Sequence, residues 1–427
     1  MKNTPVKVIV ILFLVLDSLT CFTQTQWTKY IDNPVFEPGP GTYDIIAVGQ
    51  PTVLFENDTI KMWYAGVGDD LKARICYAYS LDGIQWTKNP APVIDVGQEG
   101  DWDDGWLDTP EIVKDESGYK IYYFGDTAQQ KPEISSAIGV AYSTDGINWI
   151  RDEHNPIFSK GDPGGWDESW VESPAVMNNH VSGEYSMWYN GASTATWKIQ
   201  IGLATSADGI SWTRHNENPV LSTGNTGMYD DMWLGTPTLI SQDELYQLWY
   251  SSASSNSYNE STSGFDTIHI CYATSTDGIY WKKHVSNPLF NTYSPPYDSL
   301  IDSGGPWAPE VIFNENTGEY MMWYESLAGF SLATAPIDQS SLSGHTDDDV
   351  MIWISPNPMT DHTVLQSNIP FNNATFTIHN TEGKTVMQKS GLTGNEIRIE
   401  RSNLPDGVYI IQVIRESEIS VCKIVLN

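Results

Sequence analysis

Two acidic residues stand where a repeated motif of the chain otherwise carries glycine. The motif places an aromatic–Asp pair ahead of a proline, in YDIIAVGQP (43–51), WDDGWLDTP (102–110), WDESWVESP (166–174) and YDDMWLGTP (229–237). Two residues before the proline, the second copy has Asp108 and the third has Glu172, whereas the first and fourth copies have glycine. A repeat does not need this change in order to fold, so we expect function at these two positions.

Neighbouring carboxyl groups are suited to cleaving glycosidic bonds. One protonated carboxyl donates a proton to the leaving oxygen, and one ionised carboxylate activates water or attacks the sugar carbon. Two acids side by side push their pKa values apart, so Glu172 can stay protonated beside an ionised Asp108. Sugars also stack on flat aromatic rings, although packing between structural units is the alternative use of each ring. The candidate substrate-binding rings are Trp102, Trp106, Trp170, Trp233 and Trp307.

A second repeat indicates which elements position these residues. The phrase Ser-x-Asp-Gly-x-x-Trp recurs about every 65 residues, within 78–86, 141–149, 204–212 and 273–281. Each copy follows three short runs of aromatic and β-branched residues, such as TPEIVKD, YKIYYFG and AIGVAYS, and begins a fourth run. Four short strands in every repeat of this length predict a radial array of four-stranded sheets, the blades of a β-propeller.

The strand order places the two repeats on opposite faces. The chain enters each blade along an inner strand and reverses at every turn, so the turn between strands three and four lies far from the blade-to-blade connections. Asp and Gly fit that turn because it needs positive φ and a side chain that binds local amides. We therefore interpret the Ser-x-Asp-Gly phrase as structural. The candidate chemistry lies on the other face, here called the connection face.

The fifth repeat, residues 308–336, contains only three strand patterns. The N-terminal segment QWTKYIDNPVF (26–36) matches NWIRDEHNPIF (148–158), which supplies the fourth strand of the second repeat. We expect the N-terminal strand to complete the fifth blade, because closing the ring removes an open sheet edge. The sequence thus predicts an all-β protein with a five-bladed β-propeller over residues 25–340.

Two further segments flank the predicted propeller. Residues 1–24 combine early lysines with a short apolar run and predict a secretory signal peptide, with no membrane span. Residues 341–352 predict a linker, and the alternating patterns of 353–427 predict a small β-sandwich. The motifs PNP, NTEGK and LPDGVYIIQV in the last segment resemble the C-terminal sorting domain of the type IX secretion system of Bacteroidetes-type bacteria. The resemblance implies that the type IX machinery is a partner, and that the protein is secreted or attached to the cell surface.

The composition limits partners and cofactors. A formal net charge of −32 argues against nucleic acid and anionic membranes as partners. Cys76 and Cys271 occupy equivalent positions in two repeats, so we expect buried free thiols rather than a disulfide. Acid pairs such as Asp69–Asp70 leave a structural Ca²⁺ open, but without an EF-hand or zinc-ligand spacing no cofactor is expected. We expect a monomer.

A five-bladed propeller with acids at the start of its inner strands resembles glycoside hydrolase family 43 and its relatives, families 32, 62, 68 and 130. In family 43, an Asp of the first blade is the general base, an Asp of the second tunes the acid, and a Glu of the third is the general acid. The resemblance implies these roles for Asp44, Asp108 and Glu172, respectively. The phrase WAPEV (307–311) also resembles a family 43 phrase and adds Glu310 as a substrate-binding candidate.

The sequence leaves two assignments open: the identity of the general base, and the roles of Arg74 and His269. If Asp44 points away from the axis, the base is expected among Asp104, Glu168 and Asp231. Arg74 and His269 occupy equivalent starts of third strands on the connection face, where they can bond a substrate or simply meet solvent.

The function favoured by these patterns is a secreted, inverting glycoside hydrolase of poly- or oligosaccharides. A non-catalytic carbohydrate-binding propeller is one alternative, because the first copy reads GQP where family 43 has Asp-Pro. A family-130-like phosphorylase is another, and it would use the cations Arg74, Lys131 and Lys198. A sialidase is disfavoured because Arg151 and Arg214 lie in separate blades.

Overall fold

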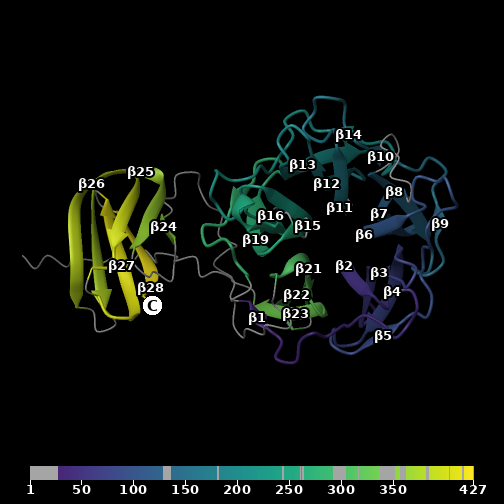
Figure 1. Ribbon diagram of the computed structural model, residues 1–427, viewed down its shortest axis with the longest axis horizontal. Helices are drawn as coiled ribbons and strands as arrows, with labels where there is room; N and C mark the ends of the chain where they lie inside the picture. Colours follow the sequence, from purple (N-terminus) through teal and green to yellow (C-terminus); the bar gives the residue numbers. More distant parts are fainter. Residues whose placement is uncertain are drawn as a thin grey trace, which may run out of the picture. The chain divides into compact units, whose positions relative to one another are not determined.

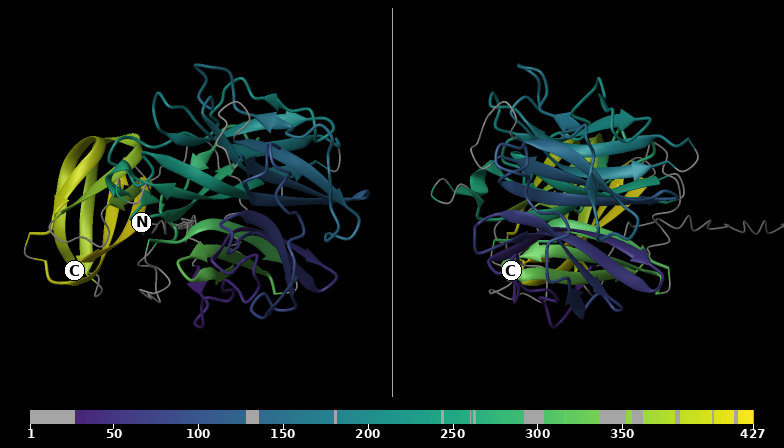
Figure 2. Two further views of the ribbon diagram at one scale, coloured as in Figure 1. Left: turned by 45° about the vertical axis from the view of Figure 1, so that its right-hand side comes forward. Right: turned by 90° about the vertical axis from the view of Figure 1, so that its right-hand side faces the viewer.

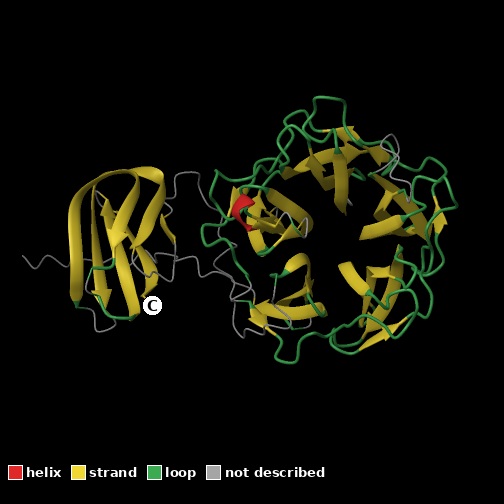
Figure 3. Ribbon diagram, viewed as in Figure 1, coloured by secondary structure: helices red, strands yellow, loops and turns green. Residues whose placement is uncertain are grey.

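The structure is a computed structural model. It describes residues 27–427 apart from 128–135, 180–181, 243–244, 260, 262–263, 292–303, 316, 337–351, 356–361, 381–383, 403, 416–417 and 427. The predicted signal peptide and nearly all of the predicted linker lie outside the described residues. The chain divides into two compact units, Thr25–Ile337 and a second that contains Asp338–Asn427. Strands dominate both, and the described residues contain one helical turn, the 3₁₀ helix η1 (Ser255–Ser257), shown in red in Figure 3.

The first unit is a ring of five antiparallel blades (Figure 1). From the inner strand outward, the first three blades are β2 (Ala47–Glu56), β3 (Thr59–Val67), β4 (Ala73–Ser80) and β5 (Trp86–Lys88); β6 (Trp106–Asp115), β7 (Gly118–Asp126), β8 (Ala137–Ser143) and β9 (Ile150–Arg151); and β11 (Trp170–Asn178), β12 (Tyr185–Ala192), β13 (Ile199–Ser206) and β14 (Thr213–Arg214). The fourth and fifth are β15 (Trp233–Gln242), β16 (Leu245–Ala253), β19 (His269–Ser275) and β20 (Lys282–Lys283); and β21 (Trp307–Asn314), β22 (Glu319–Ser326), β23 (Gly329–Pro336) and β1 (Thr28–Lys29).

Two smaller features complete this unit. β10 (Phe158–Ser159) also pairs with β8, and the fourth blade carries an insertion of η1, β17 (Tyr258–Asn259) and β18 (Gly264–Phe265). The five inner strands contact one another in ring order, and β21 lies next to β2. The start of each inner strand therefore faces a shared axis.

The N-terminal strand closes the ring, as predicted. β1 pairs antiparallel with β23, with Thr28 opposite Thr334 and Lys29 opposite Ala333. The amide of Asn33 then pairs with the backbone of Leu332, donating to its carbonyl at 3.0 Å and accepting from its N–H at 2.8 Å. Equivalent Asn side chains make the same pair of bonds to the third strands of other blades, which explains the recurring Asn-Pro: Asn155, Asn218 and Asn287.

The Ser-x-Asp-Gly turn is part of the frame, as predicted. In the second blade, Asp145 accepts hydrogen bonds from the amides of Ile147 at 2.9 Å and Asn148 at 2.8 Å. Gly146 has a φ of 78°, in the region that favours glycine. Its carbonyl accepts from the indole of Trp63 in the neighbouring blade at 2.8 Å. The turn therefore ties two blades together.

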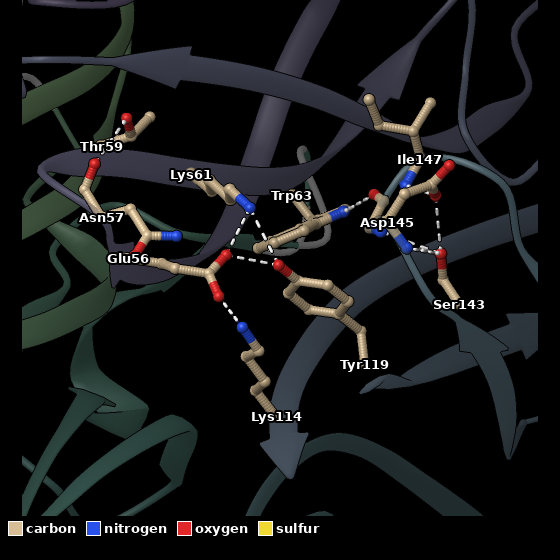
Figure 4. A network of polar contacts seen from close by, with 11 residues as sticks. Glu56, Asn57, Thr59, Lys61, Trp63, Lys114, Tyr119, Ser143, Asp145 and Ile147 are labelled. Carbon is tan, nitrogen blue, oxygen red and sulfur yellow. Dashed lines mark hydrogen bonds and ion pairs between the residues drawn. The ribbon is translucent and has the colours of Figure 1, made fainter. Parts of the chain in front are cut away.

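Aromatic contacts join every pair of neighbouring blades. The tryptophan that follows each turn, or Trp27 in the N-terminal strand, meets a ring of the adjacent blade edge to face, with centroids 5.9–6.4 Å apart. Polar contacts add to the first junction, where Glu56 ion-pairs with Lys61 of its own blade and with Lys114 of the next (Figure 4). Lys61 also donates to the hydroxyl of Tyr119 at 2.9 Å. These contacts lie beside the Asp145 turn.

The second unit corrects the predicted β-sandwich. Its strands form a single five-stranded sheet: β24 (Ile352–Ser355), β25 (His362–Asn380), β26 (Thr385–Glu400), β27 (Gly407–Arg415) and β28 (Glu418–Leu426). The long β25 pairs with β24 in its first half and with β27 in its second, and its register with β26 shifts between these halves. The sheet therefore curls around its own core, which includes Leu365, Phe376 and Ile411 (Figure 2).

Two further observations concern the described residues. Cys76 and Cys271 are buried and free, as predicted. None of the helices in the described ranges has the length and apolar character needed to cross a membrane.

Candidate active site

Each inner strand has a β-bulge at its proline. The pairing register shifts between Gly49 and Thr52 in β2, and at the equivalent step in the other four inner strands. The residue before the proline has positive φ in all five blades: Gln50 53°, Thr109 41°, Ser173 50°, Thr236 45° and Ala308 43°. Such strain is kept only where the surrounding structure imposes it, often at functional sites. These five residues and their prolines surround a small cavity of about 30 Å³ to which every blade contributes.

Asp108 lies directly before the bulge of β6 and is buried. The indole N–H of Trp106 donates to Oδ2 at 2.7 Å, whereas the buried Oδ1 accepts no hydrogen bond from the described residues. Burial raises the pKa of Asp108 well above its usual value; the charge of Glu172 raises it further and that of Glu325 adds a smaller effect, whereas hydrogen bonds from the side chains of Trp106 and Thr109 lower it. A carboxyl that keeps its proton and has one unpartnered oxygen is suited to donating that proton to a ligand.

Glu172 holds the same position in β11 and is half-buried. The indole N–H of Trp170 donates to Oε2 at 2.9 Å, and the ring of Trp170 stacks on Phe124 of the second blade with centroids 5.4 Å apart. Burial raises the pKa of Glu172, the indole bond opposes this, and the charge of Asp126 adds to it. The two predicted carboxyls therefore occupy equivalent places on adjacent inner strands.

Asp44 does not join them. Its Oδ2 lies 2.7 Å from Nζ of Lys88, in the outer strand β5, and accepts from the hydroxyl of Tyr64 at 3.0 Å. The equivalent aspartates make the same ion pair with the outer strand of their own blade: Asp103 with Arg151, Asp167 with Arg214, and Asp230 with Lys283. Asp44 therefore compensates a cation of the outer strand, which corrects its prediction as the general base.

The alternative bases also have structural partners. They cap loop amides at equivalent places, accepting from glycine N–H groups at 2.6–2.7 Å: Asp104 from Gly100, Glu168 from Gly164 and Asp231 from Gly227. None of the three is brought to the carboxyl pair by these contacts.

Glu325, which the repeated motif does not reveal, fills the space beside Gly49. It lies in β22, directly opposite Trp307 of β21, and is half-buried. A Cβ on Gly49 would lie 2.8 Å from Oε2 of Glu325, and the Gln50 N–H donates to this oxygen at 3.2 Å. Burial raises the pKa of Glu325 to about 8, against the hydrogen bonds from Gln50 and Trp307.

The sequence does distinguish Glu325 when the second strands of the five blades are aligned. Their ends align as WYAGV (63–67), YYFGD (122–126), WYNGA (188–192), WYSSA (249–253) and WYESL (323–327). The third residue is neutral in four blades and acidic only as Glu325. The same alignment isolates Asp126, whose charge acts on Glu172.

The predicted tryptophans separate into two groups. Trp102 stacks on Tyr123 at 5.6 Å and packs where Gly125 lacks a side chain, so it is structural. Trp106 is 37% exposed beside Asp108, and Trp170 and Trp307 donate to Glu172 and Glu325. Trp233 stacks on Phe265 of the fourth-blade insertion at 5.7 Å and meets Trp307 edge to face at 6.3 Å. Three of the five rings thus lie against the carboxyls.

Two of the remaining predicted binding residues are engaged by the protein itself. Glu310 accepts from the Val53 N–H at 2.7 Å and the Thr238 hydroxyl at 2.9 Å, which joins the fifth blade to the first and fourth. Arg74 is 6% exposed and forms ion pairs of 2.6 Å with both Asp70 and Asp95. These contacts correct the prediction that Glu310 and Arg74 are free to bind substrate.

Three predicted residues remain: His269, Lys198 and Lys131. Burial lowers the pKa of His269 to about 4, and its Nδ1 has no hydrogen-bond partner among the described residues. Lys198 donates to the Thr223 hydroxyl at 3.1 Å, and Lys131 lies outside the described residues.

In the sequence pairs Asp69–Asp70 and Asp103–Asp104, one acid of each pair binds an arginine: Asp70 pairs with Arg74 and Asp103 with Arg151. Over the ranges that the structure describes, no group of three or more His, Cys, Asp or Glu side chains is arranged to hold a metal ion.

Comparisons with known proteins match both units. Residues 42–262, just over half of the chain, match the sequence profile of glycoside hydrolase family 130, described as beta-1,4-mannooligosaccharide phosphorylase. Residues 353–427 match the profile of the secretion system C-terminal sorting domain. The chain is also 27% identical over 222 residues to Uncharacterized protein Rv1502 of Mycobacterium tuberculosis (strain ATCC 25618 / H37Rv), which covers 51% of this chain and 67% of that protein.

Solved structures share the fold at low identity. One is described by the words "The GH130 family of mannoside phosphorylases contains glycoside hydrolases that target beta-1,2 mannosidic linkages in Candida mannan"; it has a TM-score of 0.58 and 18% identity, and covers 75% of this chain and 96% of its own. A glycosyl hydrolase from Bacteroides ovatus has a TM-score of 0.56 and 19% identity, over 73% of this chain and 94% of its own. A thermostable family-43 glycoside hydrolase has a TM-score of 0.51 and 16% identity, over 70% and 91%.

Proposed function

Because the chain belongs to glycoside hydrolase family 130 and ends in a secretion system C-terminal sorting domain, we propose that it is an exported glycosidase that hydrolyses β-mannosidic bonds of poly- or oligosaccharides. The observation that carries the proposal is the pair formed by Asp108 and Glu172, which stand directly before the bulges of the adjacent inner strands β6 and β11 and each accept a hydrogen bond from an indole. Mannosides are proposed because the family description names mannooligosaccharides. The sorting domain indicates export across the outer membrane, to a secreted or surface-attached state.

Asp108 is the proposed general acid. Its Oδ1 is buried without a hydrogen-bond partner among the described residues, and burial together with the nearby Glu172 keeps its proton in place. A glycosidic oxygen beside Oδ1 would receive that proton as the bond breaks. This assignment exchanges the roles implied by the family 43 resemblance, in which the third-blade Glu172 donates. Hydrolysis also needs a carboxylate that accepts a proton from water, and the two half-buried carboxyls near Asp108 are Glu172 and Glu325.

Phosphorolysis is the second candidate, favoured by the family description as a phosphorylase. In that reaction phosphate replaces water as the attacking group. A phosphate dianion would have to approach the carboxyls of Glu172 and Glu325, which repel it once they are ionised, as the pH rises toward the raised pKa of Glu325. Arg74, a cation that could bind phosphate, is held between Asp70 and Asp95. These contacts support water as the attacking group.

The test uses β-1,2- and β-1,4-linked mannooligosaccharides with and without inorganic phosphate, with products followed by NMR. We expect free mannose at a rate that phosphate does not change, released with inverted anomeric configuration. Formation of mannose 1-phosphate would select the phosphorylase, and binding without any product would select the non-catalytic propeller.

The variant Asp108→Asn tests the acid. We expect turnover of oligosaccharides to fall about 100- to 10,000-fold. Dinitrophenyl β-mannoside, whose leaving group needs no proton, should lose much less. The exposed Asp69 of the connection face provides the control Asp69→Asn, which should behave as the unchanged protein. Normal oligosaccharide turnover by Asp108→Asn would overturn the proposal.

A further inference from the structure

The first blade has no acid before its bulge, yet a carboxylate lies there. Gly49 is the first-blade counterpart of Asp108 and Glu172, and a Cβ on it would lie 2.8 Å from Oε2 of Glu325. The space that a first-blade side chain would enter is therefore filled from β22 of the fifth blade. Asp44, the acid nearest to this position in the sequence, is bound to Lys88 instead.

We propose that Glu325 is the general base of this enzyme, a fifth-blade carboxylate that stands at the first-blade position and takes a proton from the attacking water. The inference rests on the proposed hydrolysis. It assigns a role to a residue that lies outside the repeated connection motif, and it makes the glycine at position 49 a requirement of the site.

The contacts of Glu325 fit this role. The Gln50 N–H donates to Oε2 at 3.2 Å, and the Trp307 side chain supplies a second hydrogen bond. Gln50 is the strained residue of the first bulge, with φ 53°, so the bulge itself aims this donor at the carboxylate. Glu325 is half-buried, which leaves part of its surface open to a ligand or to water.

Position favours Glu325 over Glu172 as the base. Glu325 fills the space beside Gly49, at the first-blade position, whereas Glu172 stands at the third-blade position, so the two acids flank Asp108 of the second blade from opposite sides. In inverting glycosidases the base faces the acid across the sugar and the attacking water. We assign that place to the first-blade position, where the family 43 resemblance also expects the base.

The step balances without any further reactant. The water oxygen forms a bond to the anomeric carbon while the bond from that carbon to the glycosidic oxygen breaks. One water proton passes to Glu325, and the leaving oxygen receives the proton of Asp108. Exchange with solvent then returns both carboxyls to their starting states.

The first experiment compares two substrates. With Glu325→Gln, kcat should fall about 100- to 10,000-fold on oligosaccharide and on dinitrophenyl β-mannoside alike, because both reactions need activated water. Asp108→Asn should instead spare the dinitrophenyl substrate. Glu319→Gln, at the other end of the same strand, is the matched control and should leave kcat unchanged.

Folding of the variant is checked by its thermal midpoint. A carboxyl whose pKa is raised on folding stabilises the native state below its unfolded pKa, and this contribution is lost as pH rises through the folded value of about 8. Glutamine does not ionise, so Glu325→Gln does not lose stability in this pH range. Its thermal midpoint at pH 8.5 should therefore equal or exceed that of the unchanged protein.

Two further variants test whether the carboxylate acts from the place it occupies, beyond the effect of removing it. In Glu325→Ala, azide should enter the vacated space, attack the anomeric carbon and give the inverted α-mannosyl azide. The double variant Gly49→Asp with Glu325→Ala moves the carboxylate onto the first blade and should regain at least tenfold in kcat over Glu325→Ala alone. Gly49→Asp alone should be impaired, because its side chain meets Glu325.

The outcomes separate the two proposals. Normal kcat/KM in Glu325→Gln, with Asp108→Asn inactive on oligosaccharide, would overturn the role of Glu325 and leave hydrolysis in place with Glu172 as base. A folded Glu325→Ala that gives no azide product, with no recovery in the double variant, would also overturn it. Full activity of Asp108→Asn would remove the proposed function itself.

Discussion

Each of the three carboxyls at the axis is bonded to an indole. Trp106 and Trp170 precede Asp108 and Glu172 by two residues, which places ring and acid on the same face of one strand. Trp307 reaches Glu325 across the strand pair. An indole N–H can only donate, and it carries no charge. It therefore orients a carboxylate without the stabilisation that a lysine or arginine would give, so burial can keep the pKa values high.

The raised pKa values predict the pH profile of the reaction. Glu325, with a pKa of about 8, must lose its proton to act as a base, so kcat/KM should rise as pH approaches 8. Asp108 must keep its proton, so activity should fall at higher pH, beyond its own raised pKa. Trp307→Phe removes a hydrogen bond that lowers the pKa of Glu325, so the rising limb should move to higher pH. Trp102→Phe, at the ring that stacks on Tyr123 apart from the carboxyls, is the control and should leave that limb in place. A profile that falls steadily from pH 5 to pH 8 would contradict the assignment.

Two of the three carboxyls could be predicted because they interrupt a repeat on the innermost strands. Glu325 was missed because it lies one strand further out, and because it serves the space of a different blade. Asp44 was misassigned for the opposite reason. Its partner Lys88 has counterparts in Arg151, Arg214 and Lys283, but only folding shows that these outer-strand cations meet the connection aspartates.

At the level of elements, each connection is tied to the outer strand of its own blade. The Asp44–Lys88 ion pair at 2.7 Å is the first-blade example, and the side chain of Asp44 is 6% exposed. The bulge of the inner strand and this ion pair hold the two ends of the same connection. Position 49 is therefore fixed from both sides.

Asp44→Asn should lower stability and spare activity. Breaking a buried ion pair from one side leaves a charge without its partner, so we expect the free energy of unfolding to fall by about 3 kcal/mol. The rate kcat should stay within about twofold at a temperature where the variant is folded. Asp167→Asn, which breaks the equivalent pair with Arg214, should give the same pattern in denaturant unfolding and in kinetics. A loss of activity comparable to that of Asp108→Asn, at unchanged stability, would return Asp44 to the catalytic set.

The strand pattern of the blades could be predicted because each strand is short and is bounded by turn residues. The C-terminal unit could not be predicted to the same depth. Alternating patterns show that strands have a buried face, but the bend within β25 is a register shift opposite β26, and a register shift leaves no mark on the alternation itself. One curled sheet and two stacked sheets therefore give the same sequence pattern.

For the molecule as a whole, closure of the ring depends on the N-terminal strand. β1 covers the edge of β23, and Trp27 meets Trp249 of the fourth blade at 6.3 Å. An uncovered strand edge is a site for pairing with other chains.

Deleting residues 27–36 should lower the thermal midpoint and cause self-association, measured by calorimetry and size-exclusion chromatography. Removing residues 353–427, which belong to the other compact unit, is the control and should leave the main unfolding transition in place. An unchanged midpoint in the first variant would show that closure contributes little.

The closing bonds join the two ends of the propeller sequence. Asn33 and Leu332 are 299 residues apart, and Gln50 meets Glu325 across 275 residues. The ribosome makes the first partner of each bond long before the second. A nascent or prematurely terminated chain therefore holds an unfinished catalytic centre, and sugar cleavage can begin only after translation has passed the last blade.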